Sequence, residues 1–338
     1  MSNDANNHRD REISLINIDG GKLHYIAKHI YKISFNPLSP FAKQPEAGAI
    51  LDDSDKELIQ DDDFKSIAHT LAMPSLKISF RQGGPASSYT AFAVYAQKHN
   101  KGVSLVSLHN NEGALSAFLF SSIEQYAKYF MANIAAPVLF KPVNALKTEQ
   151  SLEMLVFIFT LIDCFRRAYL NNLLEYSSSP VEALYEDELI AILEKELKTP
   201  DVRWLVPCLF NLVPGFENAR LDFDARHVEL AEAMDFITRT LHPQDKRPVY
   251  LLGSNAKYMG LEFSLLWKSA YGFEVISEVS NNHCCNNANI ERFFFAPTDE
   301  ANHLFRFIET GSGIEYAHIS LSSDETAEEI SDIINRHL

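Results

Sequence analysis

The chain has 338 residues, which exceeds the usual size of a single hydrophobic core and predicts about two domains. Hydrophobic residues make up 46% of the sequence, which excludes an intrinsically disordered protein. Thirty basic against forty-five acidic side chains give a formal net charge of -15, which argues against nucleic acid and anionic membranes as partners and favours a basic or amphipathic polypeptide.

The chain begins with residues that are polar and charged. Residues 1–12 contain no apolar run, so we expect a disordered tail without an export signal. Residues 13–60 are predicted to form an N-terminal hairpin and an acidic loop. A hairpin is predicted from Ile13–Ile18, the turn residues Asp19-Gly20-Gly21 and the alternating Leu23, Tyr25, Tyr31, Ile33 and Phe35. A helix over residues 22–32 is the alternative. Prolines and acids over residues 36–60 indicate the loop.

Two short motifs in the first part of the chain have structural explanations. The acids between residues 52 and 63 lack the order of ligands and glycine of a calcium loop, so we interpret them as a solvated loop that caps the next helix. The stretch Gly83–Ser88 lacks the Lys-Ser/Thr of a phosphate loop and the spacing of a dinucleotide fingerprint. It is predicted to connect two strands.

Residues 61–165 are predicted to form a first α/β unit. Its elements are a helix at 62–73, strands at 75–81, 89–97, 103–109 and 114–120, a helix at 122–134, an extended piece at 137–141 and a helix at 148–165. The most apolar run, residues 155–162, is far shorter than the roughly 20 residues that span a bilayer. We therefore expect a buried helix there and no membrane insertion.

Residues 166–225 are predicted to be a helical connector. Ser179-Pro180-Val181-Glu182 has the cap, the proline and the third-position acid of a helix start, and the helix is expected to reach residue 198. The apolar stretch 204–213, interrupted by proline, predicts a short helix packed against one of the two halves.

Residues 226–338 are predicted to form a second copy of the first unit. Phe118–Phe120 and Phe293–Phe295 are similar at an offset of 175, and the same offset relates the apolar positions of the helices that follow. The expected elements are a helix at 226–241, strands at 248–252, 259–269, 272–279 and 290–295, a helix at 297–308, an extended piece at 314–321 and a helix at 323–337. The predicted fold is α+β, a pseudo-two-fold duplication of an antiparallel sheet-plus-helices unit.

The repeated aromatic strands are the predicted interface. Phe293 and Phe295 share one face of a strand and Phe294 occupies the other, and Phe118 and Phe120 repeat this pattern around Leu119. Both faces of each strand must then be covered. The cover is either internal packing or, where the face is exposed, a partner that binds there.

The chain contains four cysteines without the spacing of a disulfide framework, which indicates reduced thiols in a cytoplasm. His283, Cys284 and Cys285 are weak metal-ligand candidates, because adjacent residues chelate poorly and no fourth ligand lies nearby. His227 lies beside acids at a predicted helix start and is a weak candidate for acid/base chemistry. The sequence predicts no resident metal or cofactor.

The function expected from these features is binding of a polypeptide by a non-enzymatic adaptor or chaperone-like protein. The duplicated sheet-and-helix layout with an acidic composition resembles bacterial secretion chaperones and adaptors, a likeness of layout that implies a protein partner and a link to secretion. Two alternatives remain open. One is an immunity or inhibitor protein with a dedicated target, and the other is an enzyme with a site between the two halves that uses His227, His283 or Cys284.

Overall fold

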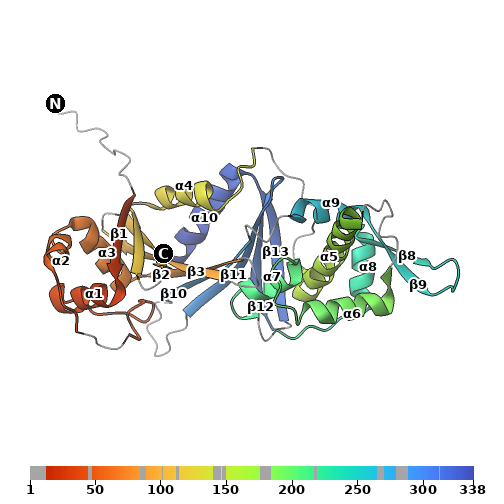
Figure 1. Cartoon of the computed structure of the whole chain (residues 1–338), viewed down its shortest axis with the longest axis horizontal. Coiled ribbons are helices and arrows are strands. Elements are labelled where there is room, and N and C mark those ends of the chain that lie inside the picture. The colour runs from red at the N-terminus through yellow and green to blue at the C-terminus, as the bar shows by residue number, and fades with distance from the viewer. Residues whose placement is uncertain are drawn as a thin grey trace.

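The computed structural model describes most of the chain. The described residues are 13–44, 48–83, 89–100, 102–111, 114–139, 146, 150–175, 184–216, 219–264, 270–278, 288–311 and 313–338. The molecule is elongated, with one large sheet running through it and helices at both ends (Figure 1). Within the described residues, no helix has both the length and the apolar character that crossing a membrane requires.

The strands are between two and eleven residues long. They are β1 (Ser14–Asp19), β2 (Leu76–Gly83), β3 (Tyr89–His99), β4 (Gly102–Asn111), β5 (Ala114–Phe120), β6 (Gln150–Ser151), β7 (Leu184–Tyr185), β8 (Ile237–Leu241), β9 (Pro248–Leu252), β10 (Tyr271–Glu278), β11 (Ala288–Pro297), β12 (Asn302–Thr310) and β13 (Gly313–Leu321).

The helices lie between the strands and after the last one. They are α1 (Gly20–Tyr25), the π-helix η1 (Ile26–Ile30), α2 (Asp53–Leu58), α3 (Asp62–Ala72), α4 (Ile123–Asn133), α5 (Leu152–Glu175), α6 (Glu186–Glu196), α7 (Leu205–Leu212), α8 (Ala225–Ala233), α9 (Ser254–Glu262) and α10 (Ser323–His337).

The large sheet is antiparallel and joins two meanders. Its strand order is β1-β5-β4-β3-β2-β10-β11-β12-β13-β6, so the meander β2–β5 meets the meander β10–β13 where β2 pairs with β10. A helix follows each meander, α4 after β5 and α10 after β13. A second, small sheet has the order β7-β9-β8 and lies at the far end of the molecule (Figure 1).

A ladder of aromatic rings crosses the junction between the meanders. Phe80 on β2 stacks on Phe92 of β3 with 4.7 Å between ring centroids, and lies 5.0 Å from Phe273 on β10. Phe273 in turn stacks on Phe293 of β11 at 4.8 Å, and Phe92 stacks on His109 of β4 at 4.7 Å. Directly opposed residues of neighbouring strands make the closest side-chain contacts in a sheet, so this ladder holds the two halves together.

The two faces of the sheet are covered differently. One face carries the aromatic ladder and packs against α4 and α10, in a core that includes Tyr126 and Ile333. The opposite face is covered at one end by α1, η1 and α3, and at the other by the helical segment that contains α5 and α7. Helices lie on both sides of the sheet in Figure 1.

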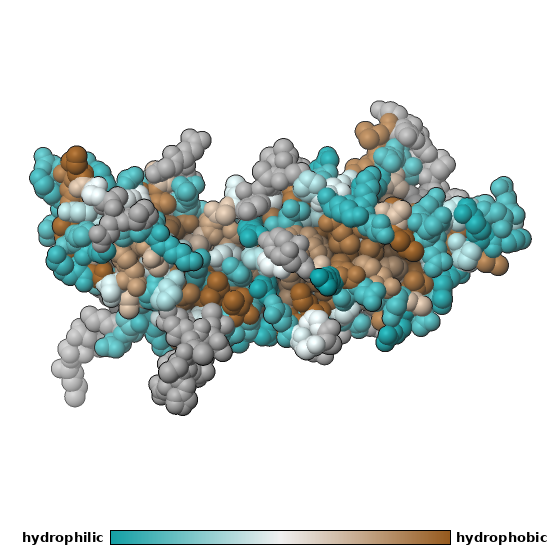
Figure 2. Space-filling model, turned by 90° about the horizontal axis from the view of Figure 1, so that it is seen from below, coloured by the Kyte–Doolittle hydropathy of each residue, from teal (hydrophilic) through white to brown (hydrophobic). Residues whose placement is uncertain are grey.

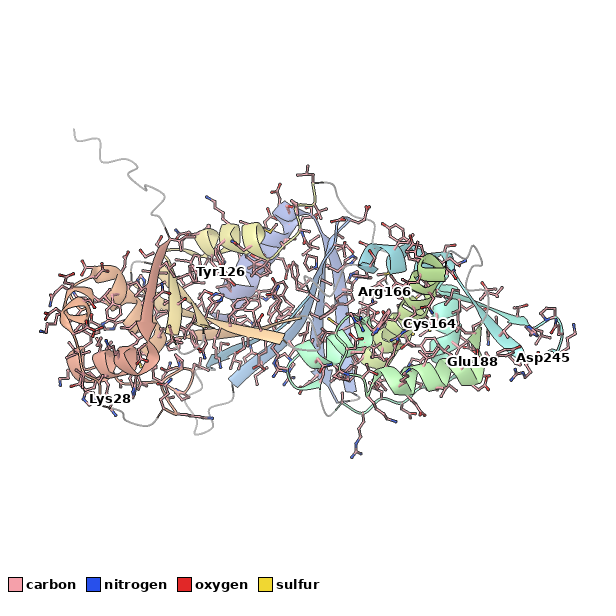
Figure 3. All side chains as sticks on the ribbon, in the orientation of Figure 1. Lys28, Tyr126, Cys164, Arg166, Glu188 and Asp245 are labelled. Carbon is pink, nitrogen blue, oxygen red and sulfur yellow. The ribbon has the colours of Figure 1, made fainter. Side chains whose placement is uncertain are left out.

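A buried ion pair fixes α7 to α5. Asp163 on α5 receives a hydrogen bond from Nη1 of Arg166 at 2.6 Å, and its other carboxylate oxygen accepts the backbone N–H of Leu205 at 2.6 Å. This carboxylate therefore caps the first turn of α7 from a different helix. Arg166 and the neighbouring Cys164 lie inside the helical end of the molecule in Figure 3. The pair is structural, and α5 continues through residue 165, where the first unit was expected to end.

Most of the predicted strands are confirmed. The predictions at 75–81, 89–97, 103–109 and 114–120 correspond to β2, β3, β4 and β5, and those at 272–279 and 290–295 correspond to β10 and β11. The helices at 122–134 and 323–337 are α4 and α10. The α+β class with a large antiparallel sheet is therefore correct.

Several predicted elements are wrong. Residues 20–30 are helical instead of forming the second strand of a hairpin, which is the alternative left open above. Most of β12 lies in the range 297–308, which was predicted to be a helix, and the predicted strand at 259–269 overlaps the helix α9. The range 226–241, predicted as one helix, is occupied by the helix α8 and then the strand β8. The extended piece predicted at 314–321, by contrast, is confirmed as the strand β13.

The offset of 175 residues is not confirmed as a structural repeat. It matches β5 with β11, yet β5 is the last strand of its meander and β11 is the second strand of the other. The similarity of Phe118–Phe120 to Phe293–Phe295 reflects a pattern shared by two-sided buried strands.

Candidate polypeptide-binding edge

The strand β1 occupies one end of the large sheet. The segment Ile13–Ile18 contains three isoleucines, whose β-branched side chains favour a strand. It pairs with β5 in a regular antiparallel register from Ser14 opposite Leu119 to Asp19 opposite Ala114. Asp19 ends the strand, because its carboxylate accepts the backbone N–H of Lys22 at 3.0 Å and caps α1.

The outer edge of β1 has no partner strand within the described part of the chain. Native proteins protect such edges with lysine, proline, a bulge or a very short strand. The six residues Ser14–Asp19 contain no lysine and no proline, and the pairing with β5 has no bulge. At the other end of the sheet, by contrast, the two-residue strand β6 pairs with β13 and blunts that edge.

Apolar side chains lie beside this open edge. Ile13 is 38% exposed and Leu15 is 52% exposed. Leu15 is opposite Phe118 on β5, which is half-buried with its ring 6.0 Å from that of Tyr129 on α4. We call Ser14–Asp19 with these flanking side chains the β1 edge. It combines unpaired backbone groups with apolar surface, the two features that an added strand uses.

The residues predicted as an interface divide into two groups. Phe120, Phe293 and Phe295 are buried beneath α4 and α10, and Phe294 is buried on the other face beside Phe159 of α5. These four side chains belong to the core of one chain, so the internal-packing alternative applies to them.

The other two predicted interface residues adjoin the β1 edge. Phe118 and Leu119 are half-buried on β5, next to β1, and Leu119 packs on the side of the N-terminal helices. The sequence predicted a strand over residues 13–18 but did not identify it as an open edge, because an edge strand and a central antiparallel strand can have the same pattern. The absence of lysine and proline in Ser14–Asp19 was the available signal.

The predicted thiol and metal candidates, His283, Cys284 and Cys285, lie outside the described residues. Cys164 and Cys208 are free and buried, and burial raises the pKa of both thiols. No three ligand-type side chains within the described ranges are arranged to hold a metal ion. The buried thiols are therefore packing residues and poor nucleophiles.

His227 lies at the start of α8 and lines a cleft of about 470 Å³. Its Nδ1 accepts the backbone N–H of Asp224 at 3.0 Å, so the pair closes a capping arrangement. The cleft lies between α8, the start of α5 and the β12–β13 hairpin, and it also contains Glu153 and Glu315. In this structure the histidine therefore completes the cap of α8.

A buried chain of titratable groups anchors α9 to the sheet. Nε2 of His303 lies 2.8 Å from Oε1 of Glu262, and Nδ1 of His303 lies 3.0 Å from Nε2 of His318. The side chains of Glu262 and His303 are 4% and 3% exposed. Burial lowers the pKa of His318 well below its usual value. This network connects α9 with β12 and β13 and is shielded from solvent.

A second cleft, of about 310 Å³, lies between α4 and the sheet, and Phe92, His109, Tyr129 and Tyr271 contribute to its lining. Apolar surface also occurs elsewhere. In Figure 2 hydrophobic areas gather in the middle of the side shown, whereas hydrophilic residues cover most of both ends. Among the described strands, β8 and much of β13 also have unpaired outer edges. The β8 edge contains Arg239, whose backbone N–H donates to Glu232. The β1 edge differs because its six residues contain no basic side chain.

Comparison with known proteins adds little to this picture. No protein-family model matches the chain, and no curated protein sequence matches it. Among solved structures, the chain is similar to the structure of the Mycobacterium tuberculosis type VII secretion system chaperone EspG5 in complex with the PE25-PPE41 dimer. The TM-score is 0.45 with 7% sequence identity, and the match covers 95% of this chain and 96% of that chain. At this TM-score the likeness carries no argument about function.

Proposed function

We propose that this protein is an adaptor or chaperone-like protein that binds an extended polypeptide. The observation that carries the proposal is the β1 edge. An unprotected strand edge is a template for another chain, and proteins that keep such an edge free of lysine, proline and bulges do so at the risk of aggregation. Use of the edge by a partner explains why it is retained.

The net charge of -15 supports the same function, because it keeps copies of the protein apart and attracts positive chains at long range. The proposal includes a cytoplasmic location and an internal duplication. In the duplication, the meander β2–β5 with α4 would correspond to the meander β10–β13 with α10.

The proposal is tested by selecting a displayed library of random peptides on three purified proteins. These are the unchanged chain, the variant Leu15→Lys, and the control variant Leu241→Lys. Leu15 and Leu241 are both exposed leucines on strands, at 52% and 58%, and Leu241 lies in the small sheet. The two variants therefore carry the same chemical change at distant places.

We expect peptides to be enriched on the unchanged chain and on Leu241→Lys, and to be lost on Leu15→Lys. Circular dichroism spectra that coincide for the three proteins would exclude unfolding as the cause of the loss. Absence of enrichment, or equal enrichment on all three proteins, would refute the proposal.

A further inference from the structure

The two sides of the β1 edge differ in chemistry. Odd-numbered residues of β1 point to the face that carries α4, where Leu15 lies exposed opposite Phe118. Even-numbered residues point to the face of the N-terminal helices, where the hydroxyl of Ser14 donates a hydrogen bond to the carboxylate of Asp63 on α3. A strand added to β1 would therefore meet apolar surface on one face and the carboxylate of Asp63 on the other.

The acidic side is formed by the start of α3. Asp61, Asp62 and Asp63 are consecutive, and Asp61 caps the helix by accepting the backbone N–H of Phe64 at 2.9 Å. Only Asp62 has a lysine partner among these three, Lys65 at 3.1 Å, in the part of the chain that the structure describes. The negative charge of the other two is balanced by hydrogen bonds and not by a cation, so this flank attracts positive side chains.

From this arrangement we infer that the β1 edge takes a basic, extended segment of another protein as an added strand. The inference rests on the proposed function and specifies its partner. In the added strand, apolar residues alternate with lysine or arginine. The apolar residues lie beside Leu15 and Ile13, and the basic residues lie on the side of Asp63. Backbone hydrogen bonds to β1 give affinity, and the alternation gives specificity.

The same charges argue against a second copy of this chain as the occupant. Antiparallel pairing of two β1 strands is related by a two-fold axis perpendicular to the sheet, so both copies of α3 would lie on the same face. The two acidic starts of α3 would approach each other, and each chain carries a net charge of -15. The segment Ser14–Asp19 also contributes an aspartate and no basic residue. Like charges placed in this way oppose association.

The test uses synthetic peptides of equal length on the full-length protein, with binding measured by fluorescence anisotropy. One peptide alternates valine and lysine, a second has the same residues in two blocks, and a third alternates valine and glutamate. A fourth is the first with its alternate amides methylated on the edge-facing side, which removes the backbone donors that an added strand needs.

We expect the alternating lysine peptide to bind at least about tenfold more tightly than each of the other three, and to weaken as salt is raised. Leu15→Lys should reduce its affinity about tenfold or more, and Asp63→Asn about threefold. Asparagine still accepts the hydrogen bond of Ser14, so this variant removes charge and keeps the local structure. Leu241→Lys should bind as the unchanged chain does.

The failures of the two proposals are distinguishable. Equal binding of the lysine and glutamate peptides, with loss on Leu15→Lys, overturns the inferred partner and leaves the general function standing. Tolerance of amide methylation overturns the added strand. A dimer that Leu15→Lys dissociates, measured by analytical ultracentrifugation, would show that a second copy is the occupant. If no peptide binds in a way that depends on Leu15, both proposals are overturned.

Discussion

The hydroxyl of Tyr126 shows how a single atom can be left unsatisfied in an otherwise well-packed core. Tyr126 lies on α4 and is 1% exposed, with its ring 5.3 Å from that of Phe120 (Figure 3). Within the described residues its hydroxyl has no hydrogen-bond partner. Burial raises the pKa of this phenol. A buried polar group without a partner loses its hydration and receives no compensation.

Tyr126→Phe is therefore expected to raise the free energy of unfolding by about 1 kcal/mol. The matched control is Tyr31→Phe, because the hydroxyl of Tyr31 donates to the backbone oxygen of Ile59 at 2.9 Å. That change should lower the free energy of unfolding by about 1 kcal/mol. Urea denaturation of both variants measures the direction of each change in the free energy of unfolding. A loss of stability in Tyr126→Phe would contradict the assignment of an unsatisfied hydroxyl.

At the scale of elements, the close contact of α7 with the sheet depends on one glycine. A Cβ atom at position 272 on β10 would lie 2.2 Å from the backbone oxygen of Leu212, at the end of α7. The contact involves two backbones, so neither side can move a side chain away to make room. Gly272 thus allows the helical segment to sit directly on the central strands.

Gly272→Ala is expected to lower the free energy of unfolding by about 1–3 kcal/mol, because the added methyl group forces α7 away from β10. Gly48→Ala is the control, since nothing described lies within 4 Å of a Cβ at that position. The control should change stability by no more than about 1 kcal/mol, in the stabilising direction. Thermal denaturation compares them, and equal stability of the two variants would contradict the close packing.

Sequence patterns predicted the elements whose periodicity is strict and missed those whose burial depends on the whole sheet. The strands β2–β5 were recognised from alternation over seven or more residues. In β12, however, Leu304, Phe305 and Phe307 are buried on both faces, and Asp299-Glu300 before them is typical of a helix start. A two-sided strand lacks a period of two, so local residues cannot separate it from a buried helix.

The candidate site was less predictable than the fold. Phe118 and Leu119 were identified from the sequence, yet the edge position of their neighbour β1 follows from strand order alone. Strand order depends on which distant segments pair, as Ser14 with Leu119, and no local pattern encodes that choice. Residues 13–35 were interpreted as a hairpin because a local pattern does not show which segments pair, and residues 20–30 are in fact helical.

At the scale of the whole molecule, the large sheet makes one cooperative body of the two halves. The core beneath α4 and α10 includes residues from both meanders, and Phe80 and Phe273 face each other at the junction. The helical segment that contains Trp204 packs on the second meander through α5 and α7. Damage at the junction should therefore reach both ends of the molecule.

Phe80→Ala is expected to lower the free energy of unfolding by about 3–5 kcal/mol, because it leaves a cavity between the rings of Phe92 and Phe273. Phe80 is in the first half, and the two tryptophans, Trp204 and Trp267, are outside it. Tryptophan fluorescence and far-ultraviolet circular dichroism should give the same shifted urea midpoint. A fluorescence midpoint that stays at the value of the unchanged chain would show that the halves unfold separately.

The pairing of β2 with β10 also orders events during synthesis on the ribosome. β2 is complete at Gly83, but β10 ends only at Glu278, so the first meander is translated long before its neighbour strand exists. Long-range strand pairing is slow because the intervening chain must first be brought together. In the nascent protein, β2 therefore presents a temporary edge of its own, and assistance from folding factors is expected at this central strand until translation passes residue 278.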